Sequence, residues 1–209
     1  HSGEVLRATA PGTTFQDCRE SSADCPVMVL IPEGTFLVMG YGLALMTDEQ
    51  EQAVTDEQEE VVREPDEGRR ISITRFAVSQ HEVTFTDWQA CVAGGGCRGA
   101  TEPSDAGWGR ETRPVINVSW EDARDYARWL SQMTGHDYRL LTWVEWQYSA
   151  RGHTSEDAPH TRFSWGDQDP VCEADAPNGA AVRACSESPR TWPVGSFAAN
   201  AFGLHDMHG

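Results

Sequence analysis

The sequence predicts an α+β domain, rich in loops, with a few short strands and about three short helices. Capping boxes begin at Ser119 and at Thr142, each with an acidic residue three positions on, and each predicts the start of a helix. Short apolar runs within 26–39 and 69–85 predict strands. Nineteen glycines and eleven prolines among 209 residues indicate that much of the chain forms turns and loops.

The predicted helices follow from their caps and their periodicity. After Ser119, apolar residues recur at helical spacing, and Gly135 ends the segment in the usual C′ position. The recurring residues are Trp120, Ala123, Ala127 and Leu130. A third capping box, which begins at Thr84, predicts another helix that ends at the glycines of 94–96.

The predicted strands lie in the first half of the chain. Residues 26–39 are interpreted as two short strands around a Pro-Glu-Gly turn. Their apolar residues are continuous rather than alternating, which is typical of a buried strand. Residues 69–85 are interpreted as a strand pair that leads into the helix after Thr84.

A single domain is expected over residues 15–209, after a flexible tail at residues 1–14. Residues 41–67 hold ten acidic residues and a single arginine. Such a segment predicts an exposed acidic insertion in the domain. The acids do not have the spacing of an EF-hand, but a divalent-cation site within the insertion remains the alternative.

The composition excludes several classes of protein. The formal net charge is −17 and all positive charge comes from arginine, so nucleic acid is not expected as a partner. No apolar run approaches the roughly 20 residues that span a membrane, and we expect no membrane insertion. Residues 1–14 lack the basic and apolar regions of a signal peptide.

The six cysteines form three pairs that are close in sequence, and we expect three local disulfides. The pairs are Cys18 with Cys25, Cys91 with Cys97, and Cys172 with Cys185. Disulfides would place the protein outside the cytosol, in the periplasm, at the cell surface or in the medium. The alternative is six reduced thiols in a cytosolic domain. No pair has the C-x-x-C spacing of a redox or zinc site.

Five segments, in this order, resemble the formylglycine-generating, or sulfatase-modifying factor, family. They are IPEGTFLVMG (31–40), FAVSQHEVTFTDWQACV (76–92), NVSWEDARDYARWLSQMTGHDYRLLTWVEWQYSARG (117–152), FSWGD (163–167) and PVGSFAANAFGLHDMHG (193–209). The resemblance implies a variant C-type lectin-like fold, with residues 26–39 as the opening hairpin of its core. Four residues depart from the usual pattern of the family, namely Leu141, Trp143, Gln147 and Ser149.

The resemblance also implies a chemistry. Formylglycine-generating enzymes oxidise a substrate cysteine with O2 at two cysteines that bind Cu(I), and soft thiolates suit that ion. Those cysteines follow an N-x-W-E-W motif, which would come after Gly209, and no cysteine of this sequence matches them. We therefore expect a domain incomplete at its C-terminus, with no catalytic residue among residues 1–209, and copper only where those cysteines exist. The alternative function is a non-catalytic module that binds a ligand, protein or peptide, such as a retroelement-diversified variable protein or an accessory domain of a bacterial signalling protein. The oligomeric state stays open.

Structural Ca²⁺ is a further expectation from the resemblance. One site would use Asp206 and the carbonyl of Gly209; a second would use Asn178, the carbonyl of Gly179, and Glu187. Ca²⁺ takes six to eight oxygen ligands, which irregular loops supply well. The alternatives are that Asn178 and Gly179 only form a turn, and that Asp206 only caps a turn.

Overall fold

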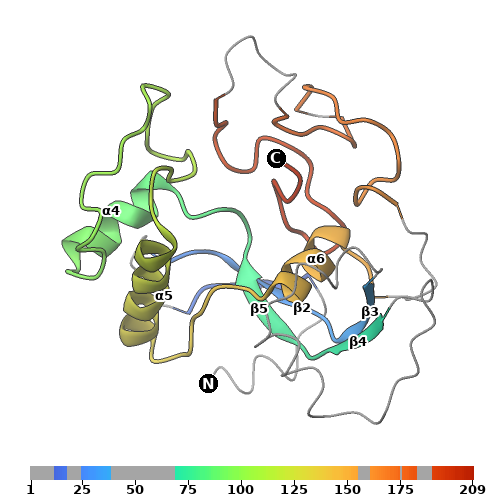
Figure 1. Cartoon of the computed structure of the whole chain (residues 1–209), viewed down its shortest axis with the longest axis horizontal. Coiled ribbons are helices and arrows are strands. Elements are labelled where there is room, and N and C mark those ends of the chain that lie inside the picture. The colour runs from blue at the N-terminus through green and yellow to red at the C-terminus, as the bar shows by residue number, and fades with distance from the viewer. Residues whose placement is uncertain (1–11, 18–24, 39–68, 155–160, 175, 183–189) are drawn as a thin grey trace.

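The structure is a computed structural model, and the residues it describes form two small sheets, three helices and long loops (Figure 1). The described residues are 12–17, 25–38, 69–154, 161–174, 176–182 and 190–209. The predicted acidic insertion at 41–67 and most of the predicted tail lie outside them. Residues 12–14 bond to the sheet, because Gly12 N–H donates to the Leu30 carbonyl and Leu30 N–H donates to the Thr13 carbonyl.

The first sheet is antiparallel, with the strand order β1-β2-β5. Its strands are β1 (Thr14–Phe15), β2 (Met28–Ile31) and β5 (Phe76–Ser79). All four residues of the central strand β2 are buried, which confirms the prediction from its continuous apolar run. All four residues of the edge strand β5 are only half-buried.

The second sheet pairs β3 (Gly34–Val38) with β4 (Arg69–Ile73). The expected hairpin within 26–39 is wrong, because β2 and β3 do not pair with each other, and the same holds for β4 and β5 within 69–85. Ile31 lies opposite Phe76 and Gly34 lies opposite Ile73, so one register runs through both sheets. The two sheets are therefore arms of a single bent ribbon.

The bend in this ribbon lies at Pro32. A proline has no N–H to donate to a ladder, so pairing is interrupted there. The Pro32 carbonyl instead accepts a hydrogen bond from the hydroxyl of Tyr148, at 3.1 Å. The connection between β2 and β3 is thus held by a helix rather than by a hairpin turn.

Three capping boxes start the three helices, as the sequence predicts. The helices are α4 (Phe85–Ala93), α5 (Trp120–Thr134) and α6 (Trp143–Arg151). At the start of α5, Asp122 N–H donates to the Ser119 hydroxyl at 3.1 Å, and Ser119 N–H donates back to the Asp122 carboxylate at 2.9 Å. Gly135 and Gly152 follow α5 and α6 in the left-handed conformation, with φ of 78° and 71°.

The first core joins the bent ribbon to α6 and to the segment near residue 203. It comprises Val29, Ile31, Phe36, Val38, Ile71, Ile73, Val144, Tyr148, Phe202 and Leu204. Asn200 fixes the last of these segments, because its amide donates to the Ser149 carbonyl at 2.7 Å and accepts from Phe202 N–H at 2.9 Å.

The second core lies between α4 and α5 and comprises Trp88, Cys91, Cys97, Tyr126, Trp129 and Leu130. The predicted Cys91–Cys97 disulfide is confirmed, with the two Cα atoms 5.5 Å apart. A Cβ at Gly96 would lie 2.5 Å from the Trp129 ring, so this glycine lets the ring pack closely in the cluster that holds the disulfide. Trp120, predicted on the apolar face of α5, is instead 61% exposed at the first turn, beside Arg124.

Two more of the described cysteines are bonded: Cys25 and Cys172 each form a disulfide. Their predicted partners, Cys18 and Cys185, lie outside the described residues. Within the described ranges, no helix is both long and apolar enough to cross a bilayer.

Candidate functional site

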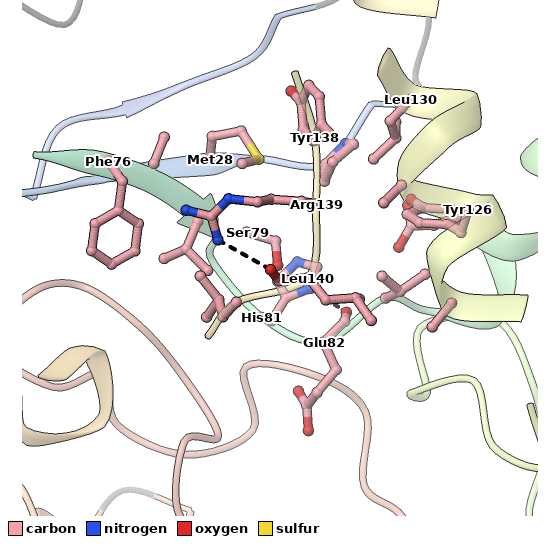
Figure 2. A pocket seen from close by; sticks show the side chains of 18 of the residues that line it. Met28, Phe76, Ser79, His81, Glu82, Tyr126, Leu130, Tyr138, Arg139 and Leu140 are labelled. Carbon is pink, nitrogen blue, oxygen red and sulfur yellow. Dashed lines mark hydrogen bonds between the residues drawn. The ribbon is translucent and has the colours of Figure 1, made fainter. Parts of the chain in front are cut away.

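A groove of about 880 Å³ lies between the first core and the second core. Its walls come from the sheet β1-β2-β5, from α5, from the segment 136–142 and from the start of α6. Figure 2 shows Phe76 and Ser79 on β5, the segment that carries Tyr138 to Leu140, and Tyr126 and Leu130 on α5. These walls are far apart in the sequence, from Phe15 on β1 to Trp146 on α6, so only the folded chain forms the groove.

The surface of the groove is mostly apolar. The described residues include five large apolar side chains that are exposed, and two of them, Leu140 at 37% and Trp146 at 42%, line the groove. Trp143 lies between them in the sequence and also lines it. Exposed apolar side chains gathered at a concave surface are typical of a binding site.

A few polar groups converge on this apolar surface. The hydroxyl of Tyr138 donates to the Asp17 carboxylate at 3.0 Å. The guanidinium of Arg139 makes two hydrogen bonds to the carboxylate of Glu145, at 2.7 and 2.6 Å. Because each of these groups has a partner, they shape the groove without needing a ligand.

Tyr126 differs from these groups. Its side chain is 4% exposed and lines the groove, and its hydroxyl has no hydrogen-bond partner among the described residues. Burial raises the pKa of Tyr126 well above its ordinary value, and the charge of Asp87 raises it further. The hydroxyl therefore stays protonated, and because its oxygen is itself buried, an acceptor in the groove would reach it only after neighbouring side chains move.

Two carboxyl groups lie near the end of β5. Burial raises the pKa of Glu82, which lines the groove, and the charge of Asp206 adds to this rise. Burial also raises the pKa of Asp206, against a hydrogen bond of 2.6 Å that its carboxylate accepts from Gly195 N–H. Asp206 has a φ of 58°, a conformation that aspartate tolerates better than most residues.

The family model for the sulfatase-modifying factor enzyme 1-like domain matches residues 14–209. The chain belongs to this family. The formylglycine-generating enzyme of Mycobacterium tuberculosis is 35% identical over 112 residues, which are 48% of this chain and 32% of that protein. The chain thus spans about a third of the length of this curated relative.

Solved structures confirm the predicted fold class. PvdO from Pseudomonas aeruginosa superposes with a TM-score of 0.58 and 32% identity over 97% of this chain and 73% of that chain. Treponema denticola variable protein 1 superposes with a TM-score of 0.55 at 16% identity, over 92% of this chain and 72% of that one, which shows the fold alone. The α+β, C-type lectin-like fold of the sulfatase-modifying factor family is therefore the fold of this chain.

Copper chemistry of the formylglycine-generating kind needs two thiolates. Each described cysteine, namely Cys25, Cys91, Cys97 and Cys172, is in a disulfide, and none is free. The described part of this sulfatase-modifying factor domain therefore does not fit copper. No step through that metal can be derived from these residues.

The calcium ligands predicted from the family come from two loops that contact each other, one after Gly179 and one at Gly209. Ala181 N–H donates to the Gly209 carbonyl at 2.8 Å, so the loop after Gly179 contacts Gly209. The amide nitrogen of Asn178 donates to the Asp169 carbonyl at 2.9 Å, while the Asp206 carboxylate accepts from Gly195 N–H.

Two observations bear on whether these residues fit Ca²⁺. Glu187 lies outside the described residues, and within the described ranges no three His, Cys, Asp or Glu side chains cluster as a metal site. A Cβ at Gly179 would lie 2.4 Å from the Glu173 carbonyl, so this glycine is required by the packing of the loop itself. Any Ca²⁺ held here would depend largely on backbone carbonyls.

The sequence did not predict the groove. Tyr126 reads as one more apolar position of an amphipathic helix, and Leu140 and Trp146 read as ordinary helix or loop residues. One partial signal was present: of the four residues that depart from the usual pattern of the family, Leu141 and Trp143 line the groove, whereas Gln147 and Ser149 do not.

Proposed function

We propose that residues 1–209 form a polypeptide-binding module of the sulfatase-modifying factor family and that the groove is its binding site. The observation that carries the proposal is the apolar groove itself, whose lining residues include Tyr126 with its buried, unpartnered hydroxyl. Its volume, about 880 Å³, is in the range of pockets that enclose a ligand. A peptide offers both apolar side chains and backbone carbonyls, which suit these two features.

The aromatic residues at the groove favour a protein or peptide over a small polar ligand. Tryptophan side chains bury large areas on binding and often dominate the energetics of protein interfaces. Trp146 and Trp143, together with Leu140, offer such anchors. The many acidic residues of the chain disfavour a nucleic acid as the ligand.

The test uses two leucine-sized positions with the same exposure. Leu140 and Met133 are both 37% exposed, but only Leu140 lines the groove. We expect Leu140→Glu to weaken the binding of extended apolar peptides at least tenfold, as measured by tryptophan fluorescence, and Met133→Glu to leave it within twofold. Equal effects of the two variants would remove the groove as the binding site.

Oxidation of a substrate cysteine is the second candidate function. It is supported by curated relatives whose names are formylglycine-generating enzyme. We expect residues 1–209 to form no formylglycine when incubated with a cysteine-containing peptide, copper and O2, because the described cysteines are in disulfides. Detection of the aldehyde by mass spectrometry would favour the oxidase over the binding module.

We also propose that Ca²⁺ stabilises the loops around Gly209. The hydrogen bond from Ala181 N–H to the Gly209 carbonyl supports this, because it places the loop after Gly179 beside Gly209. The melting temperature should rise with Ca²⁺, and Asp206→Asn should reduce the rise. Identical melting curves in Ca²⁺ and in EGTA would contradict the proposal.

An extracytoplasmic location is the fourth part of this proposal. The buried Cys91–Cys97 disulfide and the bonded Cys25 and Cys172 support it, because such bonds persist in oxidising compartments. Mass mapping of the unreduced protein from its host should find all three predicted pairs. Six free thiols would overturn both the pairing and the location.

A further inference from the structure

The register of the first sheet determines which backbone groups of β5 point away from it. Gln80 N–H donates to the Val27 carbonyl at 2.8 Å, directly beyond the pair formed by Met28 and Ser79. Because hydrogen-bonded and non-hydrogen-bonded pairs alternate along an antiparallel ladder, Val78 also bonds to β2. The N–H and C=O groups of Ala77 and Ser79 therefore point away from β2.

These outward groups lie on an open edge of the sheet. β5 is the last strand in the order β1-β2-β5, and within the described residues no strand or backbone hydrogen bond joins its outer edge. An open edge presents unpaired donors and acceptors at the spacing of a strand. Such an edge is a template for another strand.

The groove lies over the face of the sheet that carries Phe15, Met28 and Ser79, and it reaches the edge of β5. Consecutive residues of a strand point to opposite faces. Phe76 and Val78 pack against the first core, so Ala77 and Ser79 point to the other face, yet all four residues line the groove. A cavity that touches both sets extends from that face of the sheet to the edge of β5.

The chemistry of the groove indicates the kind of strand it would take. Acidic side chains line it at Asp17, Glu82, Asp87 and Asp137, whereas Arg139 is its one arginine and is paired with Glu145 outside the groove lining. The remaining surface is largely apolar. A strand with apolar side chains and a basic residue would complement both features.

We propose that the groove receives an extended apolar segment with a basic residue, from polypeptide outside residues 1–209, which adds to β5 as a further strand of the sheet. This inference rests on the proposed function and specifies how the peptide binds. Main-chain hydrogen bonds to Ala77 and Ser79 supply affinity, and the surrounding side chains supply selectivity. The hydroxyl of Tyr126, buried in the unliganded protein, becomes accessible when the segment binds and donates to an acceptor on it.

The test leaves the protein unchanged and alters the peptide. The probe is the blocked hexapeptide Arg-Val-Thr-Ile-Thr-Phe and two isomers of it, N-methylated at its odd or at its even positions. Only one set of N–H groups can face β5, because those groups alternate between the two edges of a strand. We expect one isomer to bind within threefold of the parent and the other at least thirtyfold more weakly, by tryptophan fluorescence titration.

The outcomes separate this inference from the function on which it rests. If the parent peptide binds and the two isomers bind equally, strand addition is wrong while peptide binding in the groove stands. If no peptide binds, both are wrong. Replacement of the terminal arginine by glutamate should weaken binding at least tenfold, and no change would contradict the charge complementarity.

Two further measurements complete the test. Tyr126→Phe should weaken binding of the parent peptide several-fold while the protein stays folded, and unchanged affinity would remove the role assigned to the hydroxyl. Sedimentation of the unliganded protein should show a monomer. A dimer that the peptide does not dissociate would assign the edge of β5 to a second copy and overturn the proposal.

Discussion

The two cores each contain a buried tyrosine, and the two side chains are in opposite situations. In the first core, the hydroxyl of Tyr148 donates to the Pro32 carbonyl and holds the bend of the ribbon. In the second core, Tyr126 stacks on Trp88 with ring centroids 5.7 Å apart, and its hydroxyl has no partner among the described residues. The Tyr148 hydroxyl is satisfied within the first core, whereas the Tyr126 hydroxyl is a buried donor that no described residue satisfies.

This difference has an energetic meaning. A buried hydroxyl without a partner costs about 1–3 kcal/mol relative to one that is satisfied. Such a cost is tolerated most readily where another molecule supplies the missing acceptor. The contrast between Tyr148 and Tyr126 therefore separates the part of the domain that holds the fold from the part proposed to bind.

The largest expected effect is on stability, and it shows whether the second core is tightly packed although a groove lies beside it. Trp129 is 6% exposed and belongs to the same buried cluster as Cys91 and Cys97, whereas Trp120 is 61% exposed on the same helix. We expect Trp129→Ala to lower the free energy of unfolding by about 3–5 kcal/mol and Trp120→Ala by less than about 0.5 kcal/mol. Urea denaturation measures both, and similar losses would mean that the second core is loosely packed.

The next effect compares the two tyrosines directly. Tyr148→Phe leaves the Pro32 carbonyl without its donor, and we expect a loss of about 1–2 kcal/mol in the free energy of unfolding. Tyr126→Phe removes only an unpartnered hydroxyl, so the unliganded protein should be as stable as the original or more stable. The same urea experiment checks both variants. A loss of equal size at Tyr126 would show that its hydroxyl is already bonded.

The smallest effect concerns the pair of carboxyl groups at the end of β5. The pKa values of Glu82 and Asp206 are raised in the folded state, mainly by burial, so the folded protein binds protons more tightly than the unfolded chain. Their contribution to stability therefore grows as the pH falls from the folded pKa values towards the ordinary carboxyl range, and it is lost again as the pH rises.

Asp206→Asn removes one of these charges and keeps an oxygen that can accept from Gly195 N–H. At pH 7 the variant should be more stable than the original by less than about 1 kcal/mol, because its neutral side chain bears a smaller desolvation cost. This advantage should shrink as the pH approaches 4. Unfolding free energies of the two proteins measured at several pH values test this. A stability difference that does not change with pH would contradict the buried charge of Asp206 as its cause.

The sequence predicted the features that depend on near neighbours. The three capping boxes and the Cys91–Cys97 disulfide each join residues three to six positions apart, so their partners are visible in the sequence. Gly135 and Gly152 end their helices for a similarly local reason. The overall fold was predicted from the resemblance to the sulfatase-modifying factor family, because five motifs occur in the order that is usual for that family.

Features that join distant parts of the chain were not predicted. The bent ribbon pairs 28–38 with 69–79. No local pattern predicts that the strands on either side of Pro32 pair with this distant segment instead of with each other. The groove combines Phe15, Tyr126 and Trp146, which only the fold brings together. Periodicity identifies Tyr126 as buried but does not tell whether its hydroxyl finds a partner.

The central claim is that the outer edge of β5 accepts a strand, and amide hydrogen exchange tests it most directly. With the hexapeptide bound, exchange of the Ala77 and Ser79 amides should slow at least tenfold, while the Val78 amide, already bonded to β2, should change little. Uniform slowing of all three amides, or no change at Ala77 and Ser79, would contradict the account.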